Sequence, residues 1–448
     1  MKLQYLISPE EELDEVKICQ ILQDYQTKWF PKLKKLWKYY EGKQQILNKK
    51  ATDTGKPCNK VVVNYCYNIV KNYLGYITGI PIAYSNDNFE EILDVLKYND
   101  VTQEDSEYLR KALIFGRAFE VNYIDEEGKQ RFRLFDTPQC IPVYADTLNS
   151  DLLYVIRFYE IPAIGITAEE QFYVEVYGPN SMKRYKSAVG FNSLRFIDET
   201  PYFYGQCPVT VFSLNEDEES IFAQIITLQD AYNELISGSV DDFDAFADAY
   251  LVLKGAIADD DNLKSMKENR VLMIDQDADA AYLTKDINNT QIEYLLKTTD
   301  EQIHTISNSP NFSDKNFMAQ SGEAIKYKLI GFENQSANIE NAMRKALQRR
   351  IELIAGILSL TGEEEQWRDV MIKFTRNLPN SLTPNNPQDL MTYKGLVSDE
   401  TLLGLIPFVK DVNEEMEKVK EQKESNMDLY NFPTNEIEDE NDKEDTAE

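Results

Sequence analysis

The chain has 448 residues, 42% of them hydrophobic, and 77 Asp and Glu residues against 47 Lys and Arg residues give it a formal net charge of −30. This charge excludes tight binding of the surface as a whole to nucleic acid or to an anionic membrane, because like charges repel. A single histidine and five scattered cysteines without a Cys-x-x-Cys pair argue against histidine-based catalysis, a zinc site and a disulfide framework.

The sequence predicts a globular chain without a cofactor. No apolar run approaches the roughly 18 residues of a membrane span, and the N-terminus lacks the apolar core of a signal peptide. The glycine pattern of a phosphate-binding loop is also missing. We therefore expect two to four structural units with no nucleotide, no metal ion and no membrane partner.

Residues 1–220 are predicted to begin with helices and to continue with strands. Apolar spacing between residues 10 and 50 predicts two helices, the second with lysines crowded around aromatic residues. A nucleic-acid patch and an amphipathic helix with a solvated lysine face both explain that pattern, and the second explanation is the simpler. Further helices are expected at about 65–78 and 89–115, while residues 118–213 change to the period of two that is typical of strands.

A long amphipathic helix is predicted over residues 221–253. At about 100° per residue, carboxylates fall on one face and aromatic residues on the other. The carboxylates are Asp230, Glu234, Asp241, Asp244 and Asp248, and the aromatic residues expected to pack are Phe243, Phe246 and Tyr250. One interpretation is a solvated face above a core, and the alternative is an acidic face that lines another surface.

The remaining elements follow in chain order. Residues 254–288 read as a small segment with short strands and an acidic loop, and a second helix spans 289–307. A polar loop at 308–320 precedes a very long helix over 322–360, in which Phe332, Ile339, Met343 and Leu347 hold the helical phase. A strand near residue 370, helices at 386–396, 399–406 and 411–424, and an acidic, disordered tail at 426–448 complete an α+β chain that is mainly helical.

Several stretches together resemble a known family, the portal proteins of tailed bacteriophages, in the type carried by long-tailed phages of Gram-positive hosts. The similar stretches are "YYEGKQQIL" at 39–47, "NKVVVNYCYNIVKNYLGYITGIPIAY" at 59–84, "FDTPQCIPVYAD" at 135–146, the run from 213 to 255, and "SGEAIKYKLIGFENQSANIENAMRKAL" at 321–347. Their order and spacing carry the resemblance, which covers most of the chain up to about residue 425.

The resemblance implies a ring of about twelve copies at one capsid vertex of the virion, assembled in the cytoplasm of the bacterial host. Double-stranded DNA would pass through its channel during packaging and ejection. The parts implied are a wing (1–220, with 321–380 returning to it), stem helices (221–253 and 289–307), a clip (254–288), a tunnel loop (308–320), a crown (381–425) and the tail (426–448).

The resemblance also implies partners. These are the terminase packaging motor, a head-completion adaptor, and the major capsid and scaffolding proteins, with the clip as the docking platform. In the tunnel loop, weak and exchangeable contacts with DNA are expected from Asn311, Ser313, Asp314, Lys315 and Asn316, of which Lys315 is the best placed to meet a phosphate.

The acidic helix face suits a DNA channel, because a lysine-lined wall would form many phosphate contacts and stall the polymer. We hypothesise that Asp241, Asp244 and Asp248 border the channel or a neighbouring stem. The first alternative is an enzyme that binds Mg²⁺ through these aspartates. Against this alternative, the sequence has no lysine or histidine beside them. The second alternative is an acidic helical scaffold that binds partner proteins without forming a channel.

Overall fold

The computed structural model describes the residues 4–51, 57–85, 90–162, 171–187, 189–247, 250–254, 279–283, 289–312, 322–359, 367–377, 391, 394–404, 406, 409, 412, 415–420 and 422. The chain divides into a large unit, Met1–Asn377, and a small unit, Leu378–Glu448. We describe each unit by itself.

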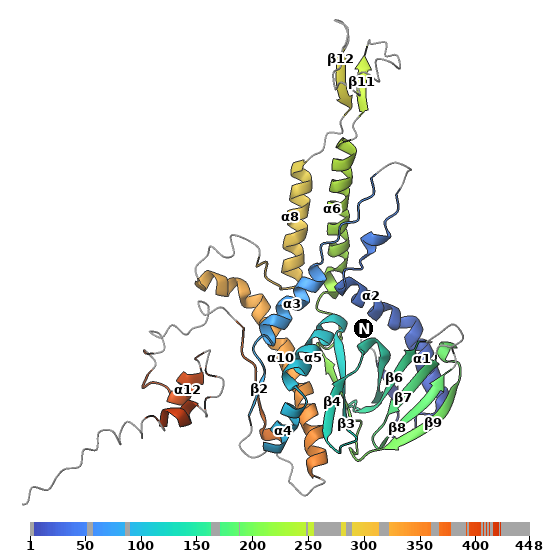
Figure 1. Cartoon of the computed structure of the whole chain (residues 1–448), viewed down its shortest axis with the longest axis vertical. Coiled ribbons are helices and arrows are strands. Elements are labelled where there is room, and N and C mark those ends of the chain that lie inside the picture. The colour runs from blue at the N-terminus through green and yellow to red at the C-terminus, as the bar shows by residue number, and fades with distance from the viewer. Residues whose placement is uncertain are drawn as a thin grey trace, which may run out of the picture. The chain divides into compact units, whose positions relative to one another are not determined.

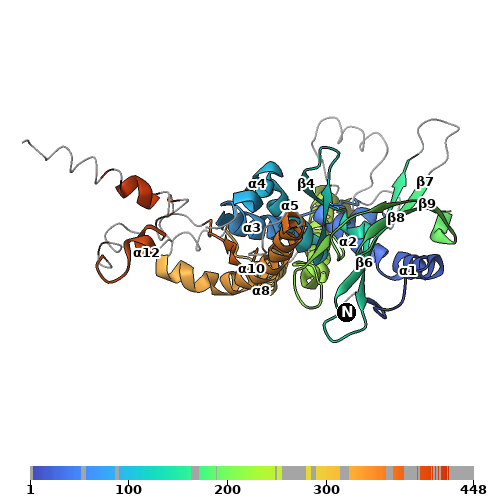
Figure 2. The same cartoon turned by 90° about the horizontal axis from the view of Figure 1, so that it is seen from below.

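The large unit begins with a short strand that the sequence did not predict, and the expected helices follow it. Its first elements are β1 (Tyr5–Ile7), α1 (Glu15–Lys28), α2 (Phe30–Tyr40), the short 3-10 helix η1 (Gln45–Asn48), α3 (Tyr65–Ile77) and β2 (Ala83–Ser85). Tyr25 of α1 is fully buried, and its hydroxyl donates to the carbonyl oxygen of Pro138 at 2.9 Å. Its ring also packs edge to face on Phe158. These contacts hold α1 against the sheet, where Figures 1 and 2 both show it.

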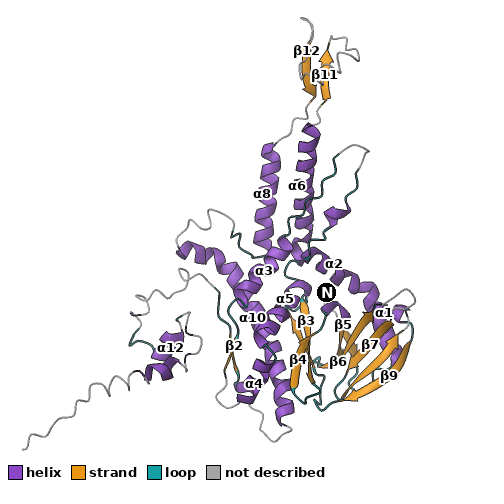
Figure 3. Ribbon diagram, viewed as in Figure 1, coloured by secondary structure: helices purple, strands orange, loops and turns teal. Residues whose placement is uncertain are grey.

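Two sheets form the β-rich region that the sequence predicts at 118–213. The six-stranded sheet has the order β1-β5-β6-β7-β8-β9, and the three-stranded sheet has the order β10-β3-β4. The strands are β3 (Arg117–Ile124), β4 (Gln130–Leu134), β5 (Cys140–Ala145), β6 (Leu152–Ile161), β7 (Gln171–Tyr177), β8 (Ser181–Ser187), β9 (Leu194–Pro201) and β10 (Val209–Ser213), with short 3-10 helices η2 (Thr137–Gln139) and η3 (Val189–Phe191). Figure 3 shows these strands gathered on one side of the helices α3, α5 and α10.

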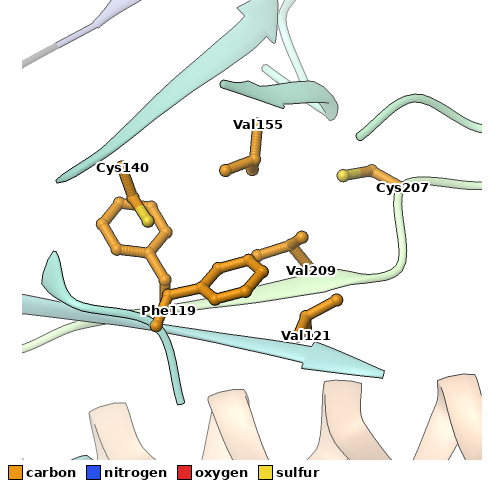
Figure 4. Close-up of a cluster of buried hydrophobic side chains, with 7 residues drawn as sticks. Phe119, Val121, Cys140, Val155, Cys207 and Val209 are labelled. Atoms are coloured by element: carbon orange, nitrogen blue, oxygen red, sulfur yellow. The ribbon is translucent and has the colours of Figure 1, made fainter. Parts of the chain in front are cut away.

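A cluster of apolar side chains joins the two sheets (Figure 4). Phe119 of β3 and Val209 of β10 pack against Cys140 of β5 and Val155 of β6, and all four are fully buried. Burial of such side chains contributes roughly 1.5–3 kcal/mol each. Cys140 is a free thiol and therefore acts as a core residue.

One helix predicted at 89–115 is two helices, α4 (Glu90–Tyr98) and α5 (Val101–Phe115). Asp100 adopts the left-handed conformation with φ 50°, which Asp and Asn tolerate better than most residues. The Asn99 side chain donates to the carbonyl oxygens of Val95 at 2.8 Å and Gln130 at 3.0 Å. Asn99 thereby ends α4 against strand β4, a contact that helical periodicity cannot reveal.

The helix predicted over 221–253 is shorter than expected at both ends. A 3-10 turn, η4 (Ala223–Ile225), precedes α6 (Ile226–Ala247), and Tyr250–Lys254 forms strand β11, paired antiparallel with β12 (Asp279–Leu283). Tyr250 is thus a strand residue and does not continue the aromatic stripe of the helix, because pairing with β12 prevails over helical phase. The other residues between 255 and 288 lie outside the described ranges.

The helices α8 (Asn289–Ile306) and α10 (Gly322–Ser359) match the predicted helices at 289–307 and 322–360 closely. Figure 1 shows α8 beside α6. Phe332 of α10 is buried between Tyr73 and Tyr76 of α3. After the 3-10 turn η5 (Trp367–Asp369), strand β13 (Met371–Lys373) is the strand predicted near residue 370, and it pairs with β2. None of the described helices is long and apolar enough to cross a membrane.

In the small unit, α12 (Asp399–Gly404) corresponds to the helix predicted at 399–406. Residues 415–420 are helical, within the prediction of 411–424. Most of the helix predicted at 386–396 and the whole of the tail predicted at 426–448 lie outside the described residues. The prediction of a mixed chain of helices and sheets is confirmed.

Candidate functional site

Helix α6 carries a ladder of polar side chains that receives an extended segment from the N-terminal part of the chain. Four backbone N–H groups of residues 59–65 donate to side-chain oxygens of α6. The pairs are Tyr65 to Gln229 Oε1 at 3.0 Å, Val63 to Asn233 Oδ1 at 3.0 Å, Val61 to Ser237 Oγ at 3.0 Å, and Asn59 to Asp241 Oδ1 at 2.6 Å. We call this set the α6 ladder.

The geometry of the two elements explains the register of the α6 ladder. Every fourth residue along a helix advances by about 6 Å, and every second residue along an extended chain advances by about 6.6 Å. Acceptors at 229, 233, 237 and 241 therefore meet N–H groups that point to the same side of the extended segment. The side chains of Gln229, Asn233 and Ser237 are fully buried, so each bond satisfies a polar group that has no access to water.

The sequence contains a signal for this contact that periodicity analysis missed. Gln229, Asn233 and Ser237 recur every four positions on one side of α6 and form a third stripe, which leads into Asp241 of the acidic stripe. Buried polar groups in a helix require partners, and an extended segment with free N–H groups supplies them.

The predicted acidic residues of α6 contact residues 39–59 of the same chain. The Tyr39 hydroxyl lies 2.8 Å from both carboxylate oxygens of Asp230. Lys49 Nζ lies 3.3 Å from Glu234 and 3.2 Å from Asp241. The Asn59 side-chain amide donates to Asp241 Oδ1 at 3.0 Å and to Asp244 Oδ2 at 2.7 Å.

The electrostatic environment of Asp241 favours its ionised form. Partial burial alone would raise the pKa of Asp241, but the backbone and side-chain N–H groups of Asn59 and the ammonium of Lys49 together hold this pKa below its usual value. Burial alone would lower the pKa of Lys49, and the carboxylates of Asp241 and Glu234 raise it above its usual value. The Asp241–Lys49 contact is therefore an ion pair at neutral pH.

A groove of about 770 Å³ runs between α6 and α8. Its walls include Tyr232, Phe243, Ile292 and Leu296, with Lys297 and Asp300 at its polar side. Phe243, one of the residues predicted to pack, is 71% exposed in the single chain, and Tyr294 on α8 is 66% exposed. The side chain of Phe246 lies outside the described side chains, and Asp248 lies outside the described residues.

The end of α8 is fixed to α3 at the start of the predicted tunnel loop. Asp300 of α8 accepts hydrogen bonds from the Tyr65 hydroxyl at 2.6 Å and from Asn311 Nδ2 at 3.2 Å. His304 Nδ1 lies 2.8 Å from the carbonyl oxygen of Ser309. Asn311 is thus bound at the root of the loop, while Ser313, Asp314, Lys315 and Asn316 lie outside the described residues.

In the sequence no lysine stands beside the aspartates of the enzyme alternative, but the fold brings Lys49 Nζ to 3.2 Å from Asp241. Asp241 and Asp244 both accept hydrogen bonds from the side-chain amide of Asn59. Over the part of the chain that the structure describes, no group of three or more His, Cys, Asp or Glu side chains is arranged to hold a metal ion. The site is built from hydrogen bonds and ion pairs between α6 and residues 39–65.

Sequence comparison relates the chain to viral structural proteins. A family model described as "Phage portal protein, SPP1 Gp6-like" matches residues 20–428. A portal protein of Clostridium phage phiCD119 is 23% identical over 433 residues, which cover 88% of this chain and 94% of that protein. A portal protein of Bacillus phage SPP1 is 23% identical over 414 residues, which cover 87% of this chain and 80% of that protein.

Solved structures of gene transfer agent particles show a weaker likeness. A chain from the neck of the empty particle gives a TM-score of 0.41 at 12% identity, covering 76% of this chain and 90% of that chain. A chain from the virion of the native particle gives a TM-score of 0.39 at 11% identity, covering 76% of this chain and 89% of that chain. The sequence match over residues 20–428 decides the family: the chain belongs to the phage portal proteins of the SPP1 Gp6-like type.

Proposed function

We propose that this portal protein forms a ring of about twelve copies around a channel through which double-stranded DNA enters and leaves the capsid. The observation that carries the proposal is the family match over residues 20–428, together with two relatives that are themselves portal proteins. The ring would occupy one capsid vertex of the virion after assembly in the host cytoplasm.

The proposed ring subunit has a stem, a wing, a clip, a tunnel loop and a crown. We assign α6 and α8 to the stem, because the two helices lie side by side and expose Phe243 and Tyr294 for packing against another copy. The sheets with α1–α5 and α10 form the wing, residues 254–288 the clip, residues 308–320 the tunnel loop, and residues 381–425 the crown. The proposed partners at the clip are the terminase motor and then the head-completion adaptor, and the capsid and scaffolding proteins surround the ring.

The contacts of the acidic face refine the proposal for the channel wall. Asp230, Glu234 and Asp241 bind Tyr39, Lys49 and Asn59, so their first role is to attach residues 39–59 to α6. Asp244 also accepts a hydrogen bond from the Asn59 side chain, but it is exposed near the end of α6, and Asp248 follows it in sequence. We therefore propose Asp244 and Asp248 as the carboxylates that border the channel or a neighbouring stem, where negative charge prevents tight phosphate contacts.

Electron microscopy of the purified full-length chain tests the proposal directly. Rings with a central hole are expected, and native mass spectrometry of the same sample should give a mass near twelve copies. A chain that stays monomeric at every concentration would contradict the ring. That result would instead favour the acidic helical scaffold that binds partner proteins without a channel.

A further inference from the structure

A lysine-rich helix face stands out against the acidic composition of the chain. Residues 28–50 contain eight lysines and one glutamate, a local charge of 8 − 1 = +7 in a chain of net charge −30. On α2, the four exposed lysines are Lys32, Lys34, Lys35 and Lys38. We call these four residues the lysine face.

The lysine face is held on a well-packed helix. Leu33 and Tyr39 of α2 are buried, and Trp37 stacks on Phe115 of α5. Figure 1 shows α2 between α1 and the lower end of α6, and the Tyr39 hydroxyl bonds to Asp230 of α6. The backbone that carries the lysine face is therefore held against α5 and α6 by the fold of a single chain.

Aromatic rings next to the lysine face are already covered by lysine side chains of the same helix. The ammonium groups of Lys32, Lys34 and Lys35 lie 4.6, 4.3 and 5.3 Å from the ring centroids of Trp29, Phe30 and Tyr39. Proteins that bind single-stranded nucleic acid need bare aromatic faces on which bases stack. The lysine face lacks that feature, so it presents positive charge without a stacking surface.

Another lysine of residues 28–50 already has an anionic partner within the chain. Lys49 binds the carboxylates of Glu234 and Asp241 on α6. Over the described residues, by contrast, none of the four ammonium groups of the lysine face has a carboxylate within 4 Å. Lys49 thus shows that carboxylates on a helix are one kind of partner that a lysine of residues 28–50 takes within a single chain.

We propose that the lysine face binds exposed carboxylates of the next copy of this chain in the ring, an inference that rests on the proposed ring assembly. Copies of net charge −30 repel each other, and neighbours in a ring meet through two different surfaces. A localised positive surface on one side of each copy relieves that repulsion where it meets an acidic surface of its neighbour. Exposed acids such as Glu293 and Glu301 on α8 are carboxylates of the required kind.

Charge reversal tests the proposal. A chain with Lys32, Lys34, Lys35 and Lys38 each changed to Glu has a net charge of −30 − 8 = −38. A matched control with the exposed lysines Lys71, Lys97, Lys186 and Lys345 changed to Glu has the same net charge on other elements. We expect the lysine-face variant to need an at least about tenfold higher chain concentration for half-assembly, and the control to change much less.

The salt dependence adds a second readout to this comparison. Salt screens the general repulsion between copies equally in the lysine-face variant and its control, because the two have the same net charge. It weakens the ion pairs of the lysine face only in the control, so the difference in assembly between the two variants should shrink as NaCl is raised. Equal assembly of wild type and lysine-face variant, or equal defects in the variant and its control, would overturn the proposal.

Cross-linking identifies the partner. Rings assembled from unlabelled and heavy-nitrogen-labelled copies are treated with a carbodiimide, which joins an amine directly to a contacting carboxylate. Mixed-isotope cross-links from the lysine face to Asp or Glu are expected, and their absence would overturn the proposal. A second result would also overturn the proposal: wild-type rings bind a short DNA duplex through the lysine face, and the lysine-face variant still assembles normally. The partner of the lysine face would then be phosphate. If the wild-type chain forms no rings at all, the proposed function fails first and this inference with it.

Discussion

The backbone N–H of Val63 donates a hydrogen bond of 3.0 Å to Oδ1 of Asn233, a residue 170 positions later whose side chain is fully buried. Asn233 uses its other end to donate to Gln44 Oε1. One amide side chain thus joins an extended segment, the end of a lysine-rich region and helix α6.

Replacing Asn233 by Ala should weaken the attachment of residues 59–65 to α6. The Val63 N–H and Gln44 Oε1 would lose their partner, and an unsatisfied buried polar group costs about 1–3 kcal/mol. We expect amide hydrogen exchange at Val61, Val63 and Tyr65 to accelerate by about tenfold to a hundredfold. The change Asn334→Ala, on the exposed side of α10, is the control and should leave these amides unchanged. Unaltered exchange in Asn233→Ala would contradict the structural role of the α6 ladder.

The Asp241–Lys49 ion pair predicts a pH-dependent contribution to stability. Because the pKa of Asp241 is lowered in the folded chain, its contribution is present above the pKa of an unfolded Asp, about 3.9, and is lost as the pH falls through the lower folded value. The change Asp241→Asn keeps an oxygen acceptor for Asn59 and removes the charge. We expect it to cost less than about 1 kcal/mol at pH 7, and the difference in melting temperature from wild type to shrink below about pH 4.

Lys49 supplies the control for that experiment. In a Lys49→Met background, the same Asp241→Asn change should lower the stability less at pH 7, since the cation that pairs with Asp241 is gone. An undiminished effect would show that the ion pair does not carry the pH dependence.

Arg350 ties the long helix α10 to the sheet through a buried charge cluster. Its guanidinium contacts Glu120 of β3 at 2.6 and 2.7 Å and Asp105 of α5 at 2.5 Å, and none of the three side chains is more than 3% exposed. Removal of one partner from such a cluster leaves buried charge and costs about 3–5 kcal/mol. We expect Arg350→Met to lower the free energy of unfolding by that amount at pH 7. Its neighbour Arg349, 27% exposed and paired with Glu352, is the control, and Arg349→Met should cost less than about 1 kcal/mol.

Acid should partly rescue the Arg350→Met chain. Burial raises the pKa of Glu120 even beside Arg350, and loss of the guanidinium raises it further. A carboxyl whose folded pKa is raised destabilises the fold as the pH rises above its unfolded value, about 4.3, so the variant should gain stability relative to wild type as the pH falls from 7 toward 5. Urea unfolding at both pH values measures this gain, and a constant gap would contradict it.

Gly116 and Gly128 form a matched pair for testing close backbone packing. Both have positive φ, 81° and 79°, but a Cβ at Gly116 would lie 2.0 Å from the Glu218 carbonyl oxygen, whereas a Cβ at Gly128 meets nothing within 4 Å. The change Gly128→Ala should cost only the conformational strain, about 1–2 kcal/mol. The change Gly116→Ala adds a clash with backbone and should yield mostly insoluble chain. Similar melting temperatures for the two variants would refute this packing.

The proposed channel wall predicts a packaging defect without an assembly defect. Changing Asp244 and Asp248 to Lys places cations where the DNA passes. It keeps the four acceptor residues of the α6 ladder and removes one hydrogen bond, from the Asn59 side chain to Asp244. We expect rings to form normally and DNA packaging to fall by at least about tenfold, because new phosphate contacts slow the polymer. The control changes Glu126 and Glu127, exposed in the turn after β3, to Lys and should package normally. Normal packaging by the Asp244/Asp248 variant would remove these residues from the channel.

Local sequence patterns were sufficient for most helices. The predictions for α3, α8 and α10 hold because an amphipathic helix buries one face, and its apolar residues must recur every three or four positions. Phe332, Ile339, Met343 and Leu347 keep that phase and are all buried. The change to a period of two after residue 118 likewise follows from the alternation of side chains in strands.

Contacts between distant segments decided the rest. Helical phase at 89–115 continues past Asn99, and only the bond from Asn99 to Gln130 on β4 shows why the helix ends there. Tyr250 fits the aromatic stripe of α6, yet pairing with Leu283 makes it a strand residue. At Asn99 the alternatives are a continued helix and a helix end, and at Tyr250 they are helix and strand. The two alternatives differ little in local free energy, so a contact with a distant part of the chain selects one of them.

By itself, the sequence determined the α+β composition, the long helices, the acidic face of α6 and membership of the portal family, since each depends on the order and spacing of neighbouring residues. Only the tertiary structure decided what that face meets. A carboxylate costs free energy to bury without a partner, and Asp241 finds its partners in Lys49 and Asn59, more than 180 positions earlier in the chain. No local pattern specifies which of 47 cations or which backbone N–H will fill that place.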